Sequence, residues 1–418
     1  MKHSSYFLIA LSFAAYCCST SRLPTEVADF AQSKVASIAS INPNDTDFKD
    51  LESVGNAIGD SRVVMLGEAS HGDGSAFLAK SRLVKYLHEQ KGFDVLAFEA
   101  DFIALNQLTL SYADVHDSLA WVKEVTSGIN PVWSATEECS ELLFSYLPQT
   151  QIDGNPLHIT GFDTQLYGLA LGARDSFYKL LEKWEYLDLP NLKSDVEALV
   201  SCALKPTNEL MALDTELASQ LHRLDSSISR LMTFVPDKSS LEFRVLQNLK
   251  DFGLQILHFS DNDFYSFRDS CMAENIKWLL DTKFTGKKMI VWAANSHISK
   301  YPTNFKVPFT SMGTYLVNQY GEDAVYALAI TAREGISGVF KATRVIESHK
   351  EGFENAVPGN LDYAFFDFNQ LSVPQDSSFY MNAFGGGPVR LRWQKHFDGV
   401  CYIKEMAAST KGRNRTSS

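Results

Sequence analysis

The chain has 418 residues, which is enough for one large domain with an insertion or for two domains. Its composition of 45% hydrophobic and 12% aromatic residues excludes a disordered or fibrous protein. The formal net charge of -12 argues against a nucleic-acid partner, because binding a phosphate backbone requires concentrated Lys and Arg.

Residues 1–18 have the layout of a signal peptide. Lys2 and His3 precede an apolar run, and Cys17 and Cys18 stand just before a polar segment. The run is too short to span a bilayer, so we expect no transmembrane segment in the mature chain. The sequence therefore predicts export to the periplasm or cell envelope. Two forms stay open: a lipoprotein anchored to the membrane through one of these cysteines, or a soluble secreted protein.

Four further cysteines follow the signal: Cys139, Cys202, Cys271 and Cys401. They are widely spaced and form no Cys-x-x-Cys pair, which argues against a zinc knuckle or a thioredoxin-like site. We expect buried free thiols, with one disulfide as the alternative.

The first buried strand is Val63–Leu66, preceded by two peripheral helices within residues 23–60. Four apolar residues cut off by a glycine are typical of a parallel strand that is covered on both faces. Glu68 and His71 follow in a Gly-rich loop, ahead of a helix that begins near Ser75. In open α/β folds this edge of the sheet carries the ligand sites. The alternative is that both residues serve only as turn and cap residues.

That helix carries Lys80 on its apolar face. A lysine buried there is costly unless a carboxylate meets it, and the alternative is a side chain that reaches out to solvent. Arg82 lies off this face and is expected to be solvated.

A second strand, 95–98, ends in Glu99, and a third, 157–162, is followed by Asp163. Residues 101–147, between these strands, are expected to be helical, with an interruption at 128–133. Trp133, at the end of this interruption, is expected to line a cavity.

Residues 178–280 follow as a predicted helical insertion, which in an enzyme is a natural lid or substrate wall. The helix that returns to the sheet begins with Arg268. A fourth strand, 289–293, is followed by Asn295 and His297. Further strands are expected at 324–330 and 400–403, and residues 411–418 are expected to be a frayed tail.

Alternating strands and helices predict an α/β fold with a central, largely parallel sheet flanked by helices and a large helical insertion. In such a sheet the carboxyl ends of the strands meet at one edge. Five titratable residues are expected there: Glu68, His71, Glu99, Asp163 and His297. Such a cluster is more typical of a functional site than of five unrelated turns.

These residues also carry a resemblance to the erythromycin esterase family. The motifs are Gly67-Glu68-x-x-His71-Gly72, Phe98-Glu99, Arg268-Asp269 and Trp292-Ala-x-Asn295-x-His297, within a domain of residues 23–410. The resemblance implies a bacterial hydrolase that opens an ester or macrocyclic lactone with water, without a covalent acyl-enzyme. It also implies macrolides as candidate substrates and a link to antibiotic resistance.

Carried over by position, the resemblance makes His71 the general base, supported by Glu68, Glu99 and His297. Lys80, Asp163, Asn295 and Arg268 would bind substrate or support the base. No cofactor is implied. Two departures, Ala294 in place of a histidine and Lys80 in place of an arginine, cast doubt on erythromycin itself as substrate more than on hydrolysis.

Two other functions stay open. The same His and Glu cluster could hold a divalent metal with an activated water, although Ala294 removes one plausible ligand. A non-catalytic exported binding protein would keep the pocket without turnover. A serine hydrolase is disfavoured, because no Gly-x-Ser-x-Gly motif occurs. The partner expected in each case is a small molecule, and the sequence does not indicate an oligomeric state.

Overall fold

The computed structural model describes residues 22–111, 118–172, 175–183, 189, 191–205, 209–210, 212–259, 264–303 and 308–412. The predicted signal peptide and residues 413–418 of the predicted tail lie outside this part of the chain, so export stays a prediction. Within the described residues, no helix combines the length and apolar character needed to cross a membrane. Cys139, Cys202, Cys271 and Cys401 are buried free thiols.

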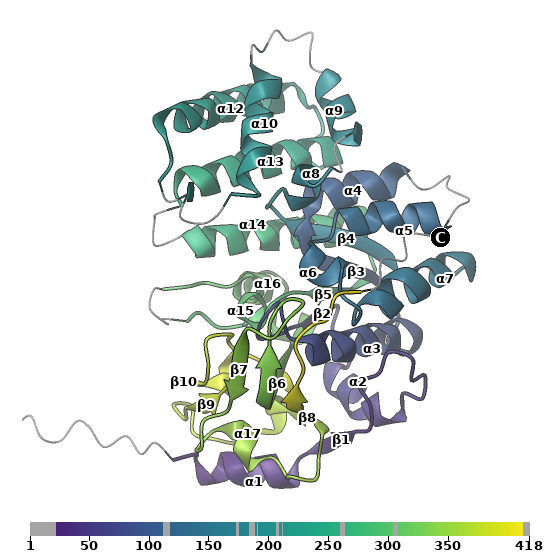
Figure 1. Ribbon diagram of the computed structural model, residues 1–418, viewed down its shortest axis with the longest axis vertical. Coiled ribbons are helices and arrows are strands. Elements are labelled where there is room, and N and C mark those ends of the chain that lie inside the picture. The colour runs from purple at the N-terminus through teal and green to yellow at the C-terminus, as the bar shows by residue number, and fades with distance from the viewer. Residues whose placement is uncertain are drawn as a thin grey trace, which may run out of the picture.

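A single large sheet forms the centre of the molecule (Figure 1), with its strands in the order β1, β8, β11, β6, β2, β5, β3, β4, and with β7 paired to β6. Its bounds are β1 Ala36–Ile38, β2 Val63–Leu66, β3 Phe93–Asp101, β4 His158–Asp163, β5 Lys288–Trp292, β6 Val325–Ser337, β7 Arg344–Glu347, β8 Tyr363–Asp367 and β11 Gly399–Met406. The six strands from β11 to β4 run parallel, whereas β1, β7 and β8 pair antiparallel. The predicted fold class is confirmed.

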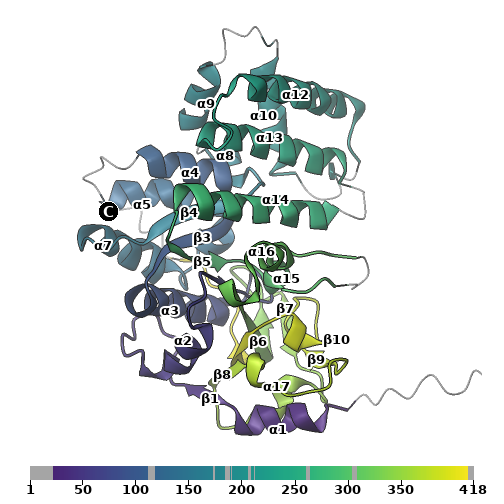
Figure 2. The same ribbon diagram turned by 180° about the vertical axis from the view of Figure 1, so that it is seen from behind.

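Helices lie on both sides of this sheet (Figures 1 and 2). Their bounds are α1 Thr25–Ser33, α2 Glu52–Ile58, α3 Gly74–Lys91, α4 Phe102–Ser111, α5 Ser118–Ser127, α6 Pro131–Ser134, α7 Leu147–Ile152, α8 Tyr167–Ala170, α15 Asn295–Ile298, α16 Met312–Tyr320 and α17 Phe353–Ala356. A π-helix, η2 Glu141–Tyr146, leads into α7. A small second sheet pairs β9 Phe379–Met381 with β10 Val389–Leu391.

The described elements between β4 and β5 are all helical: α8, α9 Asp175–Glu182, α10 Leu192–Cys202, α12 Thr215–Phe234, α13 Leu241–Leu257, α14 Phe264–Trp278 and the π-helix η4 Leu279–Lys283. Helices α10, α12 and α13 pack on one another at one end of the molecule (Figure 1), and α14 lies between them and the sheet. Of these helices, α14, which carries Arg268, therefore packs directly against the sheet.

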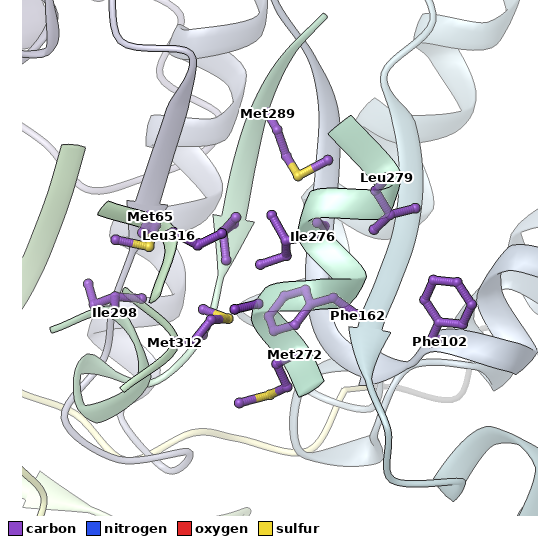
Figure 3. Packing of buried hydrophobic residues seen from close by; sticks show 14 of the residues in the cluster. Met65, Phe102, Phe162, Met272, Ile276, Leu279, Met289, Ile298, Met312 and Leu316 are labelled. Carbon is purple, nitrogen blue, oxygen red and sulfur yellow. The ribbon is translucent and has the colours of Figure 1, made fainter. Parts of the chain in front are cut away.

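The core lies on both faces of the sheet because neighbouring residues of each strand point to opposite sides. Met65 and Met289 belong to the core cluster on the α14 side; Figure 3 shows Met289 near Ile276 and Met65 near Leu316 and Ile298. Val64 and Leu66 face α3 on the other side. Apolar packing thus fixes α14 against the sheet, and this fixes the position of the polar residues at the beginning of that helix.

Several elements differ from the expectations. Strand β3 extends to Asp101, so Glu99 lies inside its carboxyl end rather than beyond it. Asp163 is the last residue of β4. Arg82 is buried and makes a two-pronged contact to Asp50, with both Nη atoms 2.8 Å from carboxylate oxygens. The expectation that Arg82 is solvated is wrong, because residues 40–50 fold over α3 and their backbone carbonyls accept hydrogen bonds from the Arg82 guanidinium group.

Candidate active site

The loop that carries Glu68 and His71 follows β2 and precedes α3, as the sequence indicates. Glycine is needed on both sides of the loop. A Cβ at Gly67 would lie 1.9 Å from Asn295 Oδ1, and a Cβ at Gly72 would lie 2.6 Å from the backbone of Gly338. The segments that follow β5 and β6 can therefore approach the loop closely and hold its backbone in place.

Glu68 is completely buried and accepts three hydrogen bonds. Lys80 Nζ donates to Oε2, His71 Nδ1 lies 3.1 Å from Oε1, and Trp133 Nε1 donates to the same Oε1 at 3.3 Å. The backbone carbonyl of Glu68 also accepts from Asn295 N at 2.8 Å. A carboxylate with this set of donors is held in one orientation.

His71 is the group at this site with an accessible ring: 40% of its side chain is exposed. Burial acts to lower its pKa, but the hydrogen bond to Glu68 and the charges of Glu99 and Glu68 outweigh it and raise the pKa above the usual value. The imidazole also contacts the indole of Trp133 edge to face, with ring centres 5.0 Å apart. The His71 imidazole is thus held in one orientation while part of its side chain stays exposed.

Lys80 is fully buried, as its place on the apolar face of α3 predicts, and a carboxylate meets it. Its ammonium group also donates to the carbonyl of Ala293 at 3.2 Å and lies over the ring of Trp292 at 4.2 Å. Burial lowers the Lys80 pKa, and the charge of Glu68 opposes this shift. Lys80 therefore supports Glu68 from inside the protein, and because it has no exposed surface it cannot contact a substrate.

A second cluster centres on Arg268. Its Nε and Nη2 atoms contact the two carboxylate oxygens of Asp163 at 3.1 and 2.6 Å, and Nη2 also lies 3.0 Å from Glu99 Oε1. The backbone N–H of Ala294 donates to the other oxygen of Glu99 at 3.1 Å. Burial acts to raise the pKa of Glu99, but the charges of His297, His71 and Arg268 hold it well below its ordinary range.

His297 completes this cluster. Its Nδ1 lies 2.8 and 2.9 Å from the two oxygens of Asp269, and its Nε2 lies 3.3 Å from Glu99 Oε1. Burial opposes protonation, but Asp269 and Glu99 together raise the His297 pKa to about 10. Asp269 is held in turn by the backbone N–H of Met312 at 2.8 Å. At neutral pH His297 is therefore an imidazolium.

The two clusters belong to one site. The charges of Glu99 and His297 both act on the His71 imidazole, although the three residues come from different strand ends. Arg268 and His297 each keep about a tenth of their side-chain surface exposed, so both retain some contact with solvent.

Asn295 was expected to bind substrate or to support the base, and its contacts are those of a supporting residue. Its side chain is fully buried, donating to the carbonyls of Ile330 and Ala383 at 2.8 Å and accepting from Ile330 N. These contacts tie the end of β5 to β6 and leave no amide group to meet a substrate. Asn295 is a structural support.

The final described residues reach back to this site. In the segment 407–412, hereafter the C-terminal strap, Ala407 O accepts from Gly74 N at 2.8 Å and Ser409 N donates to Gly72 O at 2.9 Å. Thr410 then binds the carboxylate of Glu138 through its N–H and hydroxyl groups. The strap therefore joins the His71 loop to the segment that follows Trp133.

The structure brings together seven of the eight residues that the sequence nominates, and places Asn295 behind them. It adds Asp269, which stands in a quoted motif but had no role assigned, and it gives Trp133 a hydrogen bond to Glu68. An acidic residue one position after Arg268 was the available signal for Asp269. For Trp133, the sequence offered only a polar break between two helices.

The donor set fits a metal ion poorly. Glu68 is engaged by Lys80, Asp163 by Arg268, and Asp269 by His297, so a cation would have to displace an existing positive group. Within the described residues, no group of three or more His, Cys, Asp or Glu side chains has an arrangement suited to a metal.

Comparison with known proteins gives concordant results. The model of the erythromycin esterase family matches residues 88–406. YbfO of Bacillus subtilis, named as a candidate hydrolase, is 29% identical over 326 residues, which cover 69% of this chain and 69% of that protein.

Two solved structures share the fold. A succinoglycan biosynthesis protein has a TM-score of 0.73 at 19% identity, covering 92% of this chain and 98% of that one. An erythromycin esterase mutant in an open conformation has a TM-score of 0.62 at 17% identity, covering 90% and 98%.

Proposed function

This chain belongs to the erythromycin esterase family, and on that premise we propose that it hydrolyses a carboxylic ester or macrocyclic lactone with His71 as general base. Membership makes the protein a hydrolase. The bond that it cleaves and the way it activates water are our proposal.

The observation that carries the proposal is the pairing of His71 with Glu68. A carboxylate can only accept a hydrogen bond, so the proton between them belongs to Nδ1 of the imidazole. The Nε2 atom then carries the lone pair, on a ring with 40% of its side chain exposed. This tautomer is the one that a general base needs, and Glu68 stabilises the imidazolium formed when the base takes a proton.

In the proposed reaction, His71 Nε2 takes one proton from a water molecule as the water oxygen bonds to the carbonyl carbon of the substrate. The tetrahedral intermediate carries the negative charge on the former carbonyl oxygen. When it collapses, the bond to the alkoxy oxygen breaks and the proton on His71 passes to the leaving alcohol. The products are a carboxylic acid and an alcohol, or one hydroxy acid from a lactone.

The developing negative charge needs a fixed positive partner. His297 and Arg268 are suitable, because each is protonated at neutral pH, each keeps some exposed surface, and neither must reorient during the reaction. Asp269, Asp163 and Glu99 keep these two cations in position. This support comes from the protein alone, and the pairing of each carboxylate with a cation favours a reaction without a metal ion.

The test is hydrolysis of a panel of macrolides and simple esters by the purified protein, by His71→Ala and by His222→Ala. His222 is an exposed residue of α12, far along the chain from the site, and serves as the matched control. We expect His71→Ala to lower kcat/KM by roughly 100- to 10,000-fold and His222→Ala to leave it unchanged.

Each assay is repeated after exhaustive chelation. Activity that survives chelation supports the proposal, whereas loss restored by a divalent ion would favour a metallohydrolase. Full hydrolysis by His71→Ala would contradict the role of His71. Binding of a panel member without turnover in any variant would favour a binding protein.

A further inference from the structure

Trp133 contacts both residues of the Glu68–His71 pair. Its Nε1 donates to Glu68 Oε1 at 3.3 Å, the same oxygen that holds His71 Nδ1 at 3.1 Å. The indole also meets the His71 ring edge to face, at an interplanar angle of 80°. Only 2% of Trp133 is exposed, so its contribution passes through Glu68 and His71.

The backbone that carries the indole is fixed by contacts on both sides. Asn130 caps the short helix α6 by accepting from Val132 N at 3.1 Å, and Trp133 N donates to Asn130 O at 3.0 Å. On the other side, the carbonyl of Trp133 accepts from the hydroxyl of Thr136 at 2.8 Å. The C-terminal strap then binds the residues that follow. A donor held from both sides can hold its acceptor in turn.

His71 needs such support because of where it lies. It stands in a loop with glycines nearby, and its side chain is partly exposed. Its Nδ1 is held by only one oxygen of Glu68. If the Glu68 carboxylate rotated, this hydrogen bond would break and the proton would no longer be held on Nδ1. Lys80 fixes Oε2 of Glu68 from below. Trp133 fixes the other oxygen.

We propose that Trp133 is a positioning residue of this hydrolase, whose indole N–H locks Glu68 and whose ring edge orients the His71 imidazole. The proposal rests on the proposed role of His71 and extends it to a residue on another element. Trp133 also shares the charge of Oε1 with His71. Removing the indole N–H leaves more of that charge to stabilise the imidazolium.

The test separates the indole N–H from the ring. In Trp133→Phe the aromatic contact remains but the donor is lost. The matched control is Trp278→Phe at the last residue of α14, which removes an indole hydrogen bond to the carbonyl of Ser239, just before α13. Because a substitution in a buried position can impair folding, we add the replacement of Trp133 by benzothienylalanine, which has sulfur in place of the N–H and nearly the same shape.

Two readouts are needed, and the first requires no substrate. NMR titration of the His71 ring gives its pKa, which also depends on Glu68, Glu99 and His297. We expect this pKa to rise by roughly half a unit or more in both Trp133 replacements and to stay unchanged in Trp278→Phe. The second readout is kinetic: kcat should fall roughly five-fold in the pH-independent range, with KM changed by less than about two-fold.

An unchanged His71 titration in a folded Trp133 replacement would overturn the proposal, and so would a fall in that pKa. A loss of thermal stability without the pKa shift would show a purely structural role and overturn it as well. The NMR result stands apart from catalysis: if His71→Ala keeps full activity, the proposed function fails whether or not Trp133 moves the His71 pKa.

Discussion

Lys80 and Glu68 form an ion pair in which neither side chain has any exposed surface. Removing one partner of such a pair leaves a buried charge without compensation, which typically costs about 3–5 kcal/mol. We expect Glu68→Gln to lower the free energy of unfolding by about this amount and to abolish hydrolysis, since His71 loses its carboxylate.

The double variant Glu68→Gln/Lys80→Met should recover most of the stability, because an apolar side chain of similar length replaces the stranded ammonium group. It should not recover hydrolysis. Urea unfolding and ester hydrolysis, measured side by side, distinguish the two effects. Equal stability of the single and double variants would show that the ion pair does not matter for folding.

The rate of hydrolysis should rise with pH through the His71 pKa, because only the neutral imidazole can accept a proton from water. Since Glu68 and Glu99 raise this pKa, we expect the midpoint of the acid limb of kcat/KM to lie above 6.5. The measurement is a pH–rate profile under conditions where the protein stays folded. A midpoint at or below 6.5 would mean that another group controls the limb.

The contribution of His297 to the free energy of unfolding should decrease as the pH rises from 6.5 to about 10. Its pKa is about 10 in the folded protein and 6.5 in a free side chain. The folded state therefore retains a proton that the unfolded state releases, and the stabilisation is complete below pH 6.5 and lost as the pH rises to about 10. The Tm difference between the parent protein and His297→Gln should shrink steadily across this window. A constant difference would refute the charged pair with Asp269.

Arg268→Lys should lower kcat/KM by roughly ten-fold or more, although the charge is kept. An ammonium group cannot span Asp163 and Glu99 as the guanidinium does. Arg223 offers a matched control, because it makes a similar two-pronged contact to Asp195 within the helical layer. Arg223→Lys should leave kcat/KM unchanged, and equal losses in both variants would point to a general effect on stability.

A chain that stops after Gly412 should retain full activity, whereas one that stops after Met406 should lose it. The shorter chain keeps β11 intact but lacks the C-terminal strap that binds Gly72, Gly74 and Glu138. Hydrolysis and far-ultraviolet circular dichroism together give the answer: we expect loss of activity with retained helix content. Full activity of the shorter chain would show that the strap is dispensable.

The sequence predicts the parallel part of this fold well because those strands contain apolar runs, several of which end at a glycine or a charged residue. Strands β1, β7 and β8 were not anticipated, since they are short or lie at the sheet margin, where pairing rather than composition decides the conformation. The length of β3 was also misjudged: Glu99 reads as a strand stop, yet Arg268 and Ala294 supply its partners inside the sheet edge.

The sequence could predict which residues meet at the site because most of them follow parallel strands, whose carboxyl ends lie at one edge of the sheet. Lys80 illustrates the success, because its apolar helix face required a carboxylate nearby. Arg82 illustrates the limit: two positions away on the same helix, it is just as buried, and its partner Asp50 belongs to a segment whose path over α3 leaves no periodic signal. Trp133 depends on a long-range contact of the same kind.

The C-terminal strap also bears on how the protein is made. Gly72 is synthesised early, but its carbonyl accepts hydrogen bonds from both Gly338 N and Ser409 N, so its full set of partners is present only after Ser409 has been synthesised. The sheet can begin to assemble while translation continues, but the His71 loop cannot be completed. Incomplete chains released before this point would carry every residue of the proposed reaction and still lack a finished catalytic centre.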